Sequence, residues 1–293
     1  MRQIESGTKS LDRLVERLAS INGWVEVRGK RYPSNNPHIL NEICYLLTSG
    51  EIEPSDIAWQ KGAASHLEFL IYDGVPTIYS EELFNIGNEI NEKYNAFREL
   101  RKDFIDAVEN GEYVAPDGMN KDNRAFGNAV KEFAKTRKGG RGGLTFSFGG
   151  KRESTEQEEA LTRAAESDRP NNDGADMAGV GVKSLDDIMF KLAKIESGIT
   201  VKGKDYPSNI YVINEINYLL NTGDLTLDEL SLNGKNLKTG DGCQPQTKIK
   251  YKANKRHIKA DVSNPVRPWI YSNSLIAMDN EMCKRFRELK QSR

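Results

Sequence analysis

Residues 29–35 read GKRYPSN, and residues 203–209 read GKDYPSN. Six of the seven positions are identical, although 174 positions separate the two stretches. A chance repeat of this quality is improbable, so the flanking sequence has to be compared before any other interpretation. The fold predicted from the sequence is based on this repeat.

The similarity extends far beyond the heptapeptides. KSLDRLVERLASINGWVEVRGKRYPSN, which begins at Lys9, aligns without a gap with KSLDDIMFKLAKIESGITVKGKDYPSN, which begins at Lys183. After one deletion, LNEICYLLTSGEIEPSDI aligns with INEINYLLNTGDLTLDEL, and about 21 of some 48 paired positions are identical. The match resumes in VPTIYSEELFNIGNEINEKYNAFREL and VRPWIYSNSLIAMDNEMCKRFREL. The sequence therefore predicts a tandem duplication of a domain of about 100 residues, at 9–108 and 183–293.

Each copy is predicted to be a helix-hairpin-helix-strand-helix module of the α+β class. Apolar residues recur at helical spacing after Ser10 and Ser184, which occupy the positions expected of helix N-caps. WVEVRGKRYP alternates apolar and polar residues around a Gly-Lys turn, which predicts a short hairpin. The Ser-Asn pair after the proline can cap the next helix, and Gly50 can end it. HLEFLIY, at 66–72, predicts a further strand.

A long helix is predicted to close each copy. Its apolar residues step by three or four, at Leu83, Ile86, Ile90, Tyr94, Phe97, Leu100, Phe104 and Val108, and again at Leu275, Met278, Met282, Phe286 and Leu289. Such a stripe is typical of a helix face buried in a core. A stripe of this length can also pair the two copies or two chains, so self-association through the long helices is the alternative.

The predicted organisation is a first copy at 1–109, a Gly/Arg-rich and then acidic linker at 110–182, and a second copy at 183–293. The linker is predicted to be flexible and largely disordered with short helices, since its second part is acidic and rich in small residues. No apolar run approaches the roughly 20 residues that span a bilayer, so no membrane partner is expected. The N-terminal residues lack the apolar core of a signal peptide, which favours a cytoplasmic protein.

The main divergence between the copies is a basic insertion of about 19 residues at about 233–266 of the second copy. Its candidate nucleic-acid-binding residues are Lys248, Lys250, Tyr251, Lys252, Lys255, Arg256 and Lys259. On a strand, alternating lysines lie on one face about 6.5–7 Å apart, so that face could follow a phosphate backbone. The alternative is a solvated, lysine-rich edge strand that prevents edge-to-edge association.

A second basic tract lies between the copies, in KEFAKTRKGGRGGLTFSFGGKR. Its candidate contacts are Arg137, Lys138, Arg141, Phe146 and Phe148. Arginines can meet phosphates while phenylalanine rings stack on bases, an arrangement typical of contacts with single-stranded nucleic acid. The alternative is a flexible linker that happens to be basic.

No catalytic or cofactor site is predicted. The three histidines, His38, His66 and His257, have no cysteine or carboxylate at zinc-ligand spacing, so no metal site is expected. Nucleophile-elbow and phosphate-loop motifs are absent from the sequence. The repeated Asn-Glu pair at Glu42 and Glu215 is interpreted as a polar helix face or a hydrogen bond between the copies. Tyr32 and Tyr206 are interpreted as packing residues with solvated hydroxyls.

The function that the sequence favours is non-enzymatic binding of nucleic acid, either DNA or RNA and single strands included, with weak sequence specificity. Two modules on one tether would gain avidity on a polymer, and contacts to phosphate would make binding strongly salt-dependent. The alternative is a protein-protein scaffold, an assembly factor or a viral or phage particle subunit with two quasi-equivalent domains. A formal net charge of only −1 and the long apolar stripe favour that alternative.

Overall fold

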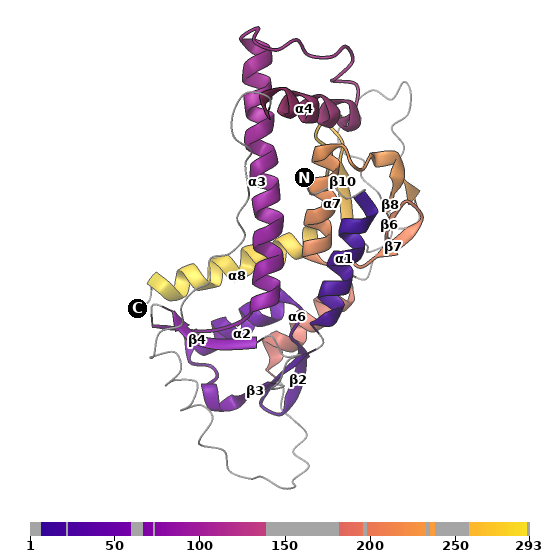
Figure 1. The fold of residues 1–293 in the computed structure, drawn as a ribbon. Helices are drawn as coiled ribbons and strands as arrows, with labels where there is room; N and C mark the ends of the chain where they lie inside the picture. The colour runs from indigo at the N-terminus through magenta and orange to yellow at the C-terminus, as the bar shows by residue number, and fades with distance from the viewer. Residues whose placement is uncertain are drawn as a thin grey trace. The chain divides into compact units, whose positions relative to one another are not determined.

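The computed structural model describes residues 7–21, 23–59, 67–72, 74–138, 182–195, 198–232, 235–237 and 258–291. Within these residues the protein is mixed α+β, with seven α-helices and small antiparallel sheets (Figure 1). None of the described helices has the length and apolar composition that crossing a membrane requires.

The first aligned segment begins with helix α1 and hairpin β1–β2, which β3 extends into a three-stranded sheet of order β2-β1-β3. Helix α2 separates the hairpin from β3, and a second hairpin, β4–β5, leads into the long helix α3. The bounds are α1 Gly7–Ser20, β1 Trp24–Val27, β2 Lys30–Pro33, α2 Pro37–Ser49, β3 Ile57–Trp59, β4 Leu67–Tyr72, β5 Val75–Ser80, α3 Glu81–Glu109 and, after it, α4 Asn123–Lys138.

The second aligned segment has a similar order of elements. Its first sheet has the order β7-β6-β8-β9, and its second hairpin is β10–β11, followed by the closing helix α8. The bounds are α6 Lys183–Ala193, β6 Ile199–Val201, β7 Lys204–Tyr206, α7 Ile210–Thr222, β8 Leu230–Leu232, β9 Lys235–Asn236, β10 Ile258–Asp261, β11 Trp269–Ser272 and α8 Asn273–Gln291.

The turns that begin the two heptapeptides have the same backbone geometry. Arg28 and Lys202 both have φ of 50°, and the glycines that follow them have φ of 79° and 81°. Two successive residues in the left-handed region close a tight hairpin whose twist matches that of the strands, and glycine takes this conformation without steric cost. The predicted hairpins are present, but their turns are Arg28-Gly29 and Lys202-Gly203, one residue before the predicted Gly-Lys turn, because Lys30 and Lys204 already pair in the strands.

Helix capping matches the sequence in part. Gly50 ends α2 in the left-handed conformation, with φ of 79°, as predicted. Asn209 of the second heptapeptide caps α7, but the cap of α2 is Asn36, one residue beyond the first heptapeptide. Ser10 lies inside α1 rather than at its N-cap. The strand predicted at 66–72 is confirmed as β4. It pairs with β5, which the sequence analysis did not predict, and a further short strand, β3, joins the first sheet.

The chain folds into two compact units that cut across the sequence boundaries 1–109, 110–182 and 183–293. Unit 1 consists of Met1–Glu16, Ile86–Phe146 and Lys194–Ile276. Unit 2 consists of Arg17–Asn85, Ser147–Ala193 and Ala277–Arg293. Each unit therefore contains the sheets and second helix of one aligned segment and helices from the ends of the other. The boundaries of the compact units therefore differ from the boundaries of the aligned segments.

Unit 1 contains an aromatic core between α3 and α4. Phe104 is fully buried, and its ring lies edge-on to those of Tyr113, Phe126 and Phe133, with centroids 5.6–5.8 Å apart. Figure 1 shows α4 lying across the C-terminal end of α3. The sequence predicts 110–182 to be largely disordered with short helices; 123–138 form a packed helix, and 139–181 lie outside the described residues.

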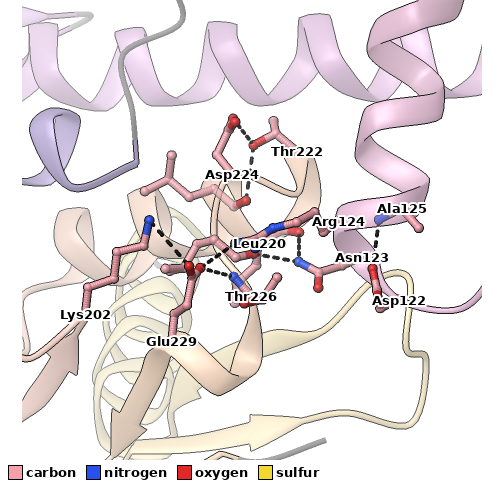
Figure 2. A network of polar contacts seen from close by, with 12 residues as sticks. Asp122, Asn123, Arg124, Ala125, Lys202, Leu220, Thr222, Asp224, Thr226 and Glu229 are labelled. Carbon is pink, nitrogen blue, oxygen red and sulfur yellow. Dashed lines mark hydrogen bonds and ion pairs between the residues drawn. The ribbon is translucent and has the colours of Figure 1, made fainter.

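A polar network attaches the start of α4 to the end of α7 (Figure 2). The buried Asn123 donates through Nδ2 to the carbonyl oxygens of Leu220 and Leu225, both at 2.7 Å. Arg124 binds Glu229 at 2.8 Å. Burial raises the pKa of Glu229, but hydrogen bonds from the Thr226 backbone N–H and from Arg124 outweigh it, so that the pKa is lowered overall. The network thus joins the start of α4 to the end of α7 and the residues after it through buried hydrogen bonds and an ion pair.

Unit 2 has its core around α2, β5 and the helices that pack on them. Ile39, Ile43 and Leu46 on α2 are fully buried. Cys44 binds the main chain of β5, because its Sγ lies 3.2 Å from both the N and the O of Ile78. Tyr45 meets the ring of Phe286 on α8 edge-on, at a centroid distance of 5.4 Å.

Candidate nucleic-acid interface

Strand β10 of hairpin β10–β11 lies in the last part of the basic insertion at about 233–266, and it carries Lys259, the last of the predicted basic residues. In its register Lys259 lies opposite Tyr271, and Asp261 lies opposite Trp269. The alternate residues Ile258, Ala260 and Ile270 are buried. Because side chains alternate across a strand, Lys259, Asp261, Trp269 and Tyr271 share the outward face of the hairpin.

Helix α7 holds the hairpin in place through one buried side chain. Asn217 is fully buried, donates to the carbonyl oxygen of Ile270 and accepts from its N–H, both at 2.8 Å. An amide side chain can do both because it carries a donor and an acceptor, so it pairs with a strand as a second strand would. Cys44 occupies the aligned position in the first segment and binds Ile78 in the same two-sided way.

Aromatic and basic side chains from α3 and from the turn of the hairpin extend the outward face. Trp269 is 37% exposed, and Tyr94 on α3 contacts its ring edge-on at a centroid distance of 6.3 Å. Arg101 follows Tyr94 by seven residues, which is two helical turns, so the two lie on the same side of α3. The guanidinium of Arg101 stacks on the ring of Phe126, 4.7 Å from its centroid.

Arg267 lies close enough to Arg101 to repel it. Burial lowers the pKa of the Arg101 guanidinium, and the positive charge of Arg267 lowers it further. The turn places Arg267 through Asn264, whose carbonyl oxygen accepts the N–H of Arg267 while its side chain accepts that of Val266. Among the described residues, no carboxylate forms an ion pair with Arg101, Arg267 or Lys259. We name Tyr94, Arg101, Lys259, Arg267, Trp269 and Tyr271 the Arg-Trp face.

This arrangement resembles the chemistry that single-stranded nucleic acid needs. An exposed indole offers a surface on which a base can stack, and two unneutralised guanidiniums can bind phosphate bidentately. Asp261 is the one carboxylate on the outward side of the hairpin, and it accepts the N–H of Ser263 at 3.0 Å. The charge of the Arg-Trp face is therefore positive.

The structure describes only part of the predicted binding set. Lys259 lies on the Arg-Trp face, half-buried. Arg137 lies elsewhere, at the end of α4, where it forms an ion pair with Asp103 and stacks on Phe133. Lys138 ends α4, and nothing further is described of it. The other predicted residues lie outside the described ones: Lys248, Lys250, Tyr251, Lys252, Lys255, Arg256, Arg141, Phe146 and Phe148.

Sequence reasoning missed Tyr94, Arg101, Arg267 and Trp269. One signal for two of them was present, because Arg267 and Trp269 come directly after the basic insertion in VRPW. Nothing in the sequence connects Tyr94 or Arg101 with that stretch, since Arg267 comes 166 positions after Arg101 and Trp269 comes 175 positions after Tyr94. Only the packing of α3 in unit 1 brings these residues together.

The other polar side chains that the sequence singled out have structural partners. Glu42 is fully buried and binds Arg285 at 2.6 and 3.0 Å, and Glu215 binds Lys93 at 3.2 Å. Both pairs join the two aligned segments, so the interpretation as a contact between segments is confirmed. The interpretation of Tyr32 and Tyr206 as packing residues with solvated hydroxyls is wrong in part, because each hydroxyl donates to an aspartate. No group of three or more potential metal ligands occurs within the described part of the chain.

Comparisons of this chain with protein-family models, with curated proteins and with solved structures found no match.

Proposed function

We propose that this chain is a cytoplasmic, non-enzymatic nucleic-acid-binding protein with weak sequence specificity. The observation that supports this function best is the Arg-Trp face. It combines an exposed tryptophan with cations that have no described carboxylate partner, and five further basic residues precede Lys259 between Lys248 and Arg256. Phosphate contacts position a nucleic acid without reading its sequence, which accounts for the weak specificity.

In the same proposal the two aligned segments are copies of one duplicated module, and the residues between α4 and the second segment connect them. The equal hairpin turns support the duplication, as do the equivalent roles of Cys44 and Asn217. The Arg-Trp face then belongs to the second module, with Tyr94 and Arg101 supplied by α3. The Arg/Gly/Phe tract that contains Arg141, Phe146 and Phe148 would add looser contacts to the same strand.

Fluorescence anisotropy with labelled single-stranded and double-stranded oligonucleotides, of DNA and of RNA, tests the function. Measurements at about 50 and about 200 mM salt give the dependence of affinity on salt. The insertion variant changes Lys248, Lys250, Lys252, Lys255 and Arg256 to Gln, and the face variant combines Arg101→Gln with Arg267→Gln. We expect the face variant to lower the slope of log affinity against log salt by about 1.4, because each phosphate contact on a single strand contributes about 0.7.

The matched control is Lys191→Gln with Lys290→Gln, which removes the same charge from exposed lysines of unit 2, whereas the Arg-Trp face belongs to unit 1. This control should bind like the original protein. Trp269→Ala should weaken binding of single strands about tenfold and change duplex binding little, because stacking needs an unpaired base. Absence of binding at either salt concentration would overturn the proposed function.

The second candidate is a protein-protein component: a scaffold, an assembly factor or a particle subunit. The observation that favours it is that each compact unit is assembled from both aligned segments, as interlocked subunits often are. Light scattering of the protein in dilute buffer separates the candidates. A defined oligomer favours the scaffold, and a monomer of 32.9 kDa argues against it.

A further inference from the structure

Each of the two hairpins that carry the heptapeptides binds an aspartate from a helix of the other aligned segment. In unit 2, Lys30 Nζ and Tyr32 OH lie 2.7 and 2.8 Å from Oδ1 of Asp186 on α6. In unit 1, Lys204 Nζ and Tyr206 OH lie 2.8 and 2.6 Å from Oδ1 of Asp12 on α1. The donors are the lysine and the tyrosine of GKxYP in both cases, so the two sites have the same chemistry.

The helices that supply the aspartates share a sequence motif. Lys-Ser-Leu-Asp occurs once in α1, ending at Asp12, and once in α6, ending at Asp186. The leucine before each aspartate is fully buried, and the tyrosine that binds the aspartate is 1% exposed in one hairpin and 3% in the other. A buried leucine contributes affinity and the adjacent charged hydrogen bonds contribute orientation, which together define a recognition site for one face of a helix.

The electrostatics of the sites support recognition of a charged carboxylate. Hydrogen bonds from Lys204 and then Tyr206 lower the pKa of Asp12, and the hydrogen bond from Lys30 is the largest cause of the lowered pKa of Asp186. Burial raises the pKa of both tyrosines, and the adjacent aspartate raises it further. Each tyrosine therefore remains a hydrogen-bond donor while each aspartate remains ionised.

A second pair of contacts joins the closing helix of each aligned segment to the second helix of the other segment. Arg285 on α8 binds the fully buried Glu42 of α2, and Lys93 on α3 binds Glu215 of α7, which is 1% exposed. Removing one member of a buried ion pair leaves an uncompensated charge, so these contacts require their partner segment to be present. Each half of the chain thus supplies an aspartate and a cation to the other half.

We propose that each GKxYP hairpin is a recognition site for a helix carrying Lys-Ser-Leu-Asp, and that the two reciprocal sites hold the halves of this chain together without the residues that connect them. The ligand of each hairpin is the helix from the other half of the same chain. The two glutamate-cation pairs and the network between α4 and α7 are further contacts between the halves, so the variants described below test the contribution of the aspartates separately. This inference does not depend on nucleic-acid binding.

The test uses the full chain with a specific protease site inserted between residues 139 and 181. After cleavage, size-exclusion chromatography with light scattering should give one species of the same mass as the uncut protein, 32.9 kDa plus the inserted site. Separation into two fragments under native conditions would overturn the proposal. A doubled mass after cleavage alone would show that helices are exchanged between chains, and would overturn the assignment to the same chain.

Variants test the recognition itself. Asp12→Asn combined with Asp186→Asn should weaken association of the cleaved halves about tenfold or more, measured by dilution, because each loses charged hydrogen bonds from two donors. The matched control is Glu16→Gln with Asp187→Asn, which removes the same charge from exposed positions on the same two helices. Equal dissociation constants for the two variants would overturn the role of the aspartates. Circular dichroism of both uncut double variants, and of the corresponding single variants, shows whether they fold like the original protein. A folded variant with weakened association separates this effect from loss of folding.

Discussion

At the scale of single residues, close backbone contact depends on a glycine. A Cβ added to Gly127 of α4 would lie 2.1 Å from the carbonyl oxygen of Thr222 and 2.8 Å from the backbone N of Gly223. Backbone atoms cannot move aside as a flexible side chain can. Gly127 costs α4 some helix propensity, but it allows the helix to approach the end of α7 closely enough for Asn123 to reach two carbonyl oxygens.

Gly127→Ala should therefore destabilise unit 1 by about 2 kcal/mol or more, because the added methyl group cannot be accommodated without moving α4. The matched control is Gly87→Ala on α3, where the nearest atom would be a Tyr211 side-chain carbon at an ordinary 3.5 Å. That control should be neutral or stabilising by up to about 1 kcal/mol through helix propensity. Urea unfolding followed by circular dichroism measures both. Equal midpoints for the two variants would contradict the close approach.

At the scale of elements, the sequence of α4 has both a helical period of apolar residues and an N-cap residue. Phe126, Val130 and Phe133 follow a helical period and are buried, and Asp122 accepts the N–H of Ala125 at 2.7 Å as an N-cap. The stripe is short and lies next to a glycine-rich basic tract, so composition suggested a linker. Packing against Phe104 of α3 supplies the burial that makes this segment a stable helix.

Phe104→Ala should lower the free energy of unfolding by about 3–5 kcal/mol, because it removes a fully buried ring from the α3–α4 core. Phe84→Ala on the same helix is the matched control, since Phe84 is 61% exposed. Its cost should stay below about 1 kcal/mol. Denaturant unfolding measures both variants, and a similar loss for the two would show that α4 does not pack on α3 as described.

At the scale of the whole molecule, the aligned segments are not the compact units. The first and last helices of each segment contribute to the unit that contains the sheets of the other segment. The contacts inside each unit include ionised groups, so the assembly of both units should depend on pH. Asp12 and Asp186 have pKa values lowered below their ordinary 3.8 by hydrogen bonds, chiefly from Lys204 and Lys30.

The sign of the pH effect follows from that direction. A carboxyl group whose pKa is lowered in the folded state contributes its full stability above the unfolded pKa and loses it as pH falls through the folded pKa. Association of the cleaved halves should therefore be insensitive to these two groups at neutral pH and weaken below about pH 4. In the variant Asp12→Asn with Asp186→Asn this part of the pH dependence should disappear. An unchanged acid profile in the variant, measured by light scattering, would contradict the prediction.

Local sequence was sufficient for features that depend on neighbouring residues. The hairpins, with their turns displaced by one residue, the cap at Gly50 and the apolar stripes of α2 and α3 follow from side-chain size, glycine conformation and helical period, which depend on residues close in sequence. The α+β class follows from the same patterns. The repeat itself also needs only the sequence, because it is a comparison of the chain with itself.

Tertiary structure alone decided which segments meet. Asp12 with Tyr206, Arg285 with Glu42 and Trp269 with Tyr94 join residues far apart in the chain. The two aligned segments carry nearly the same helices, so a local pattern predicts that a helix has an apolar face and cannot specify which segment covers it. Burial of that face and pairing of its charges are satisfied only in the complete fold, and in this protein they are satisfied by the other segment.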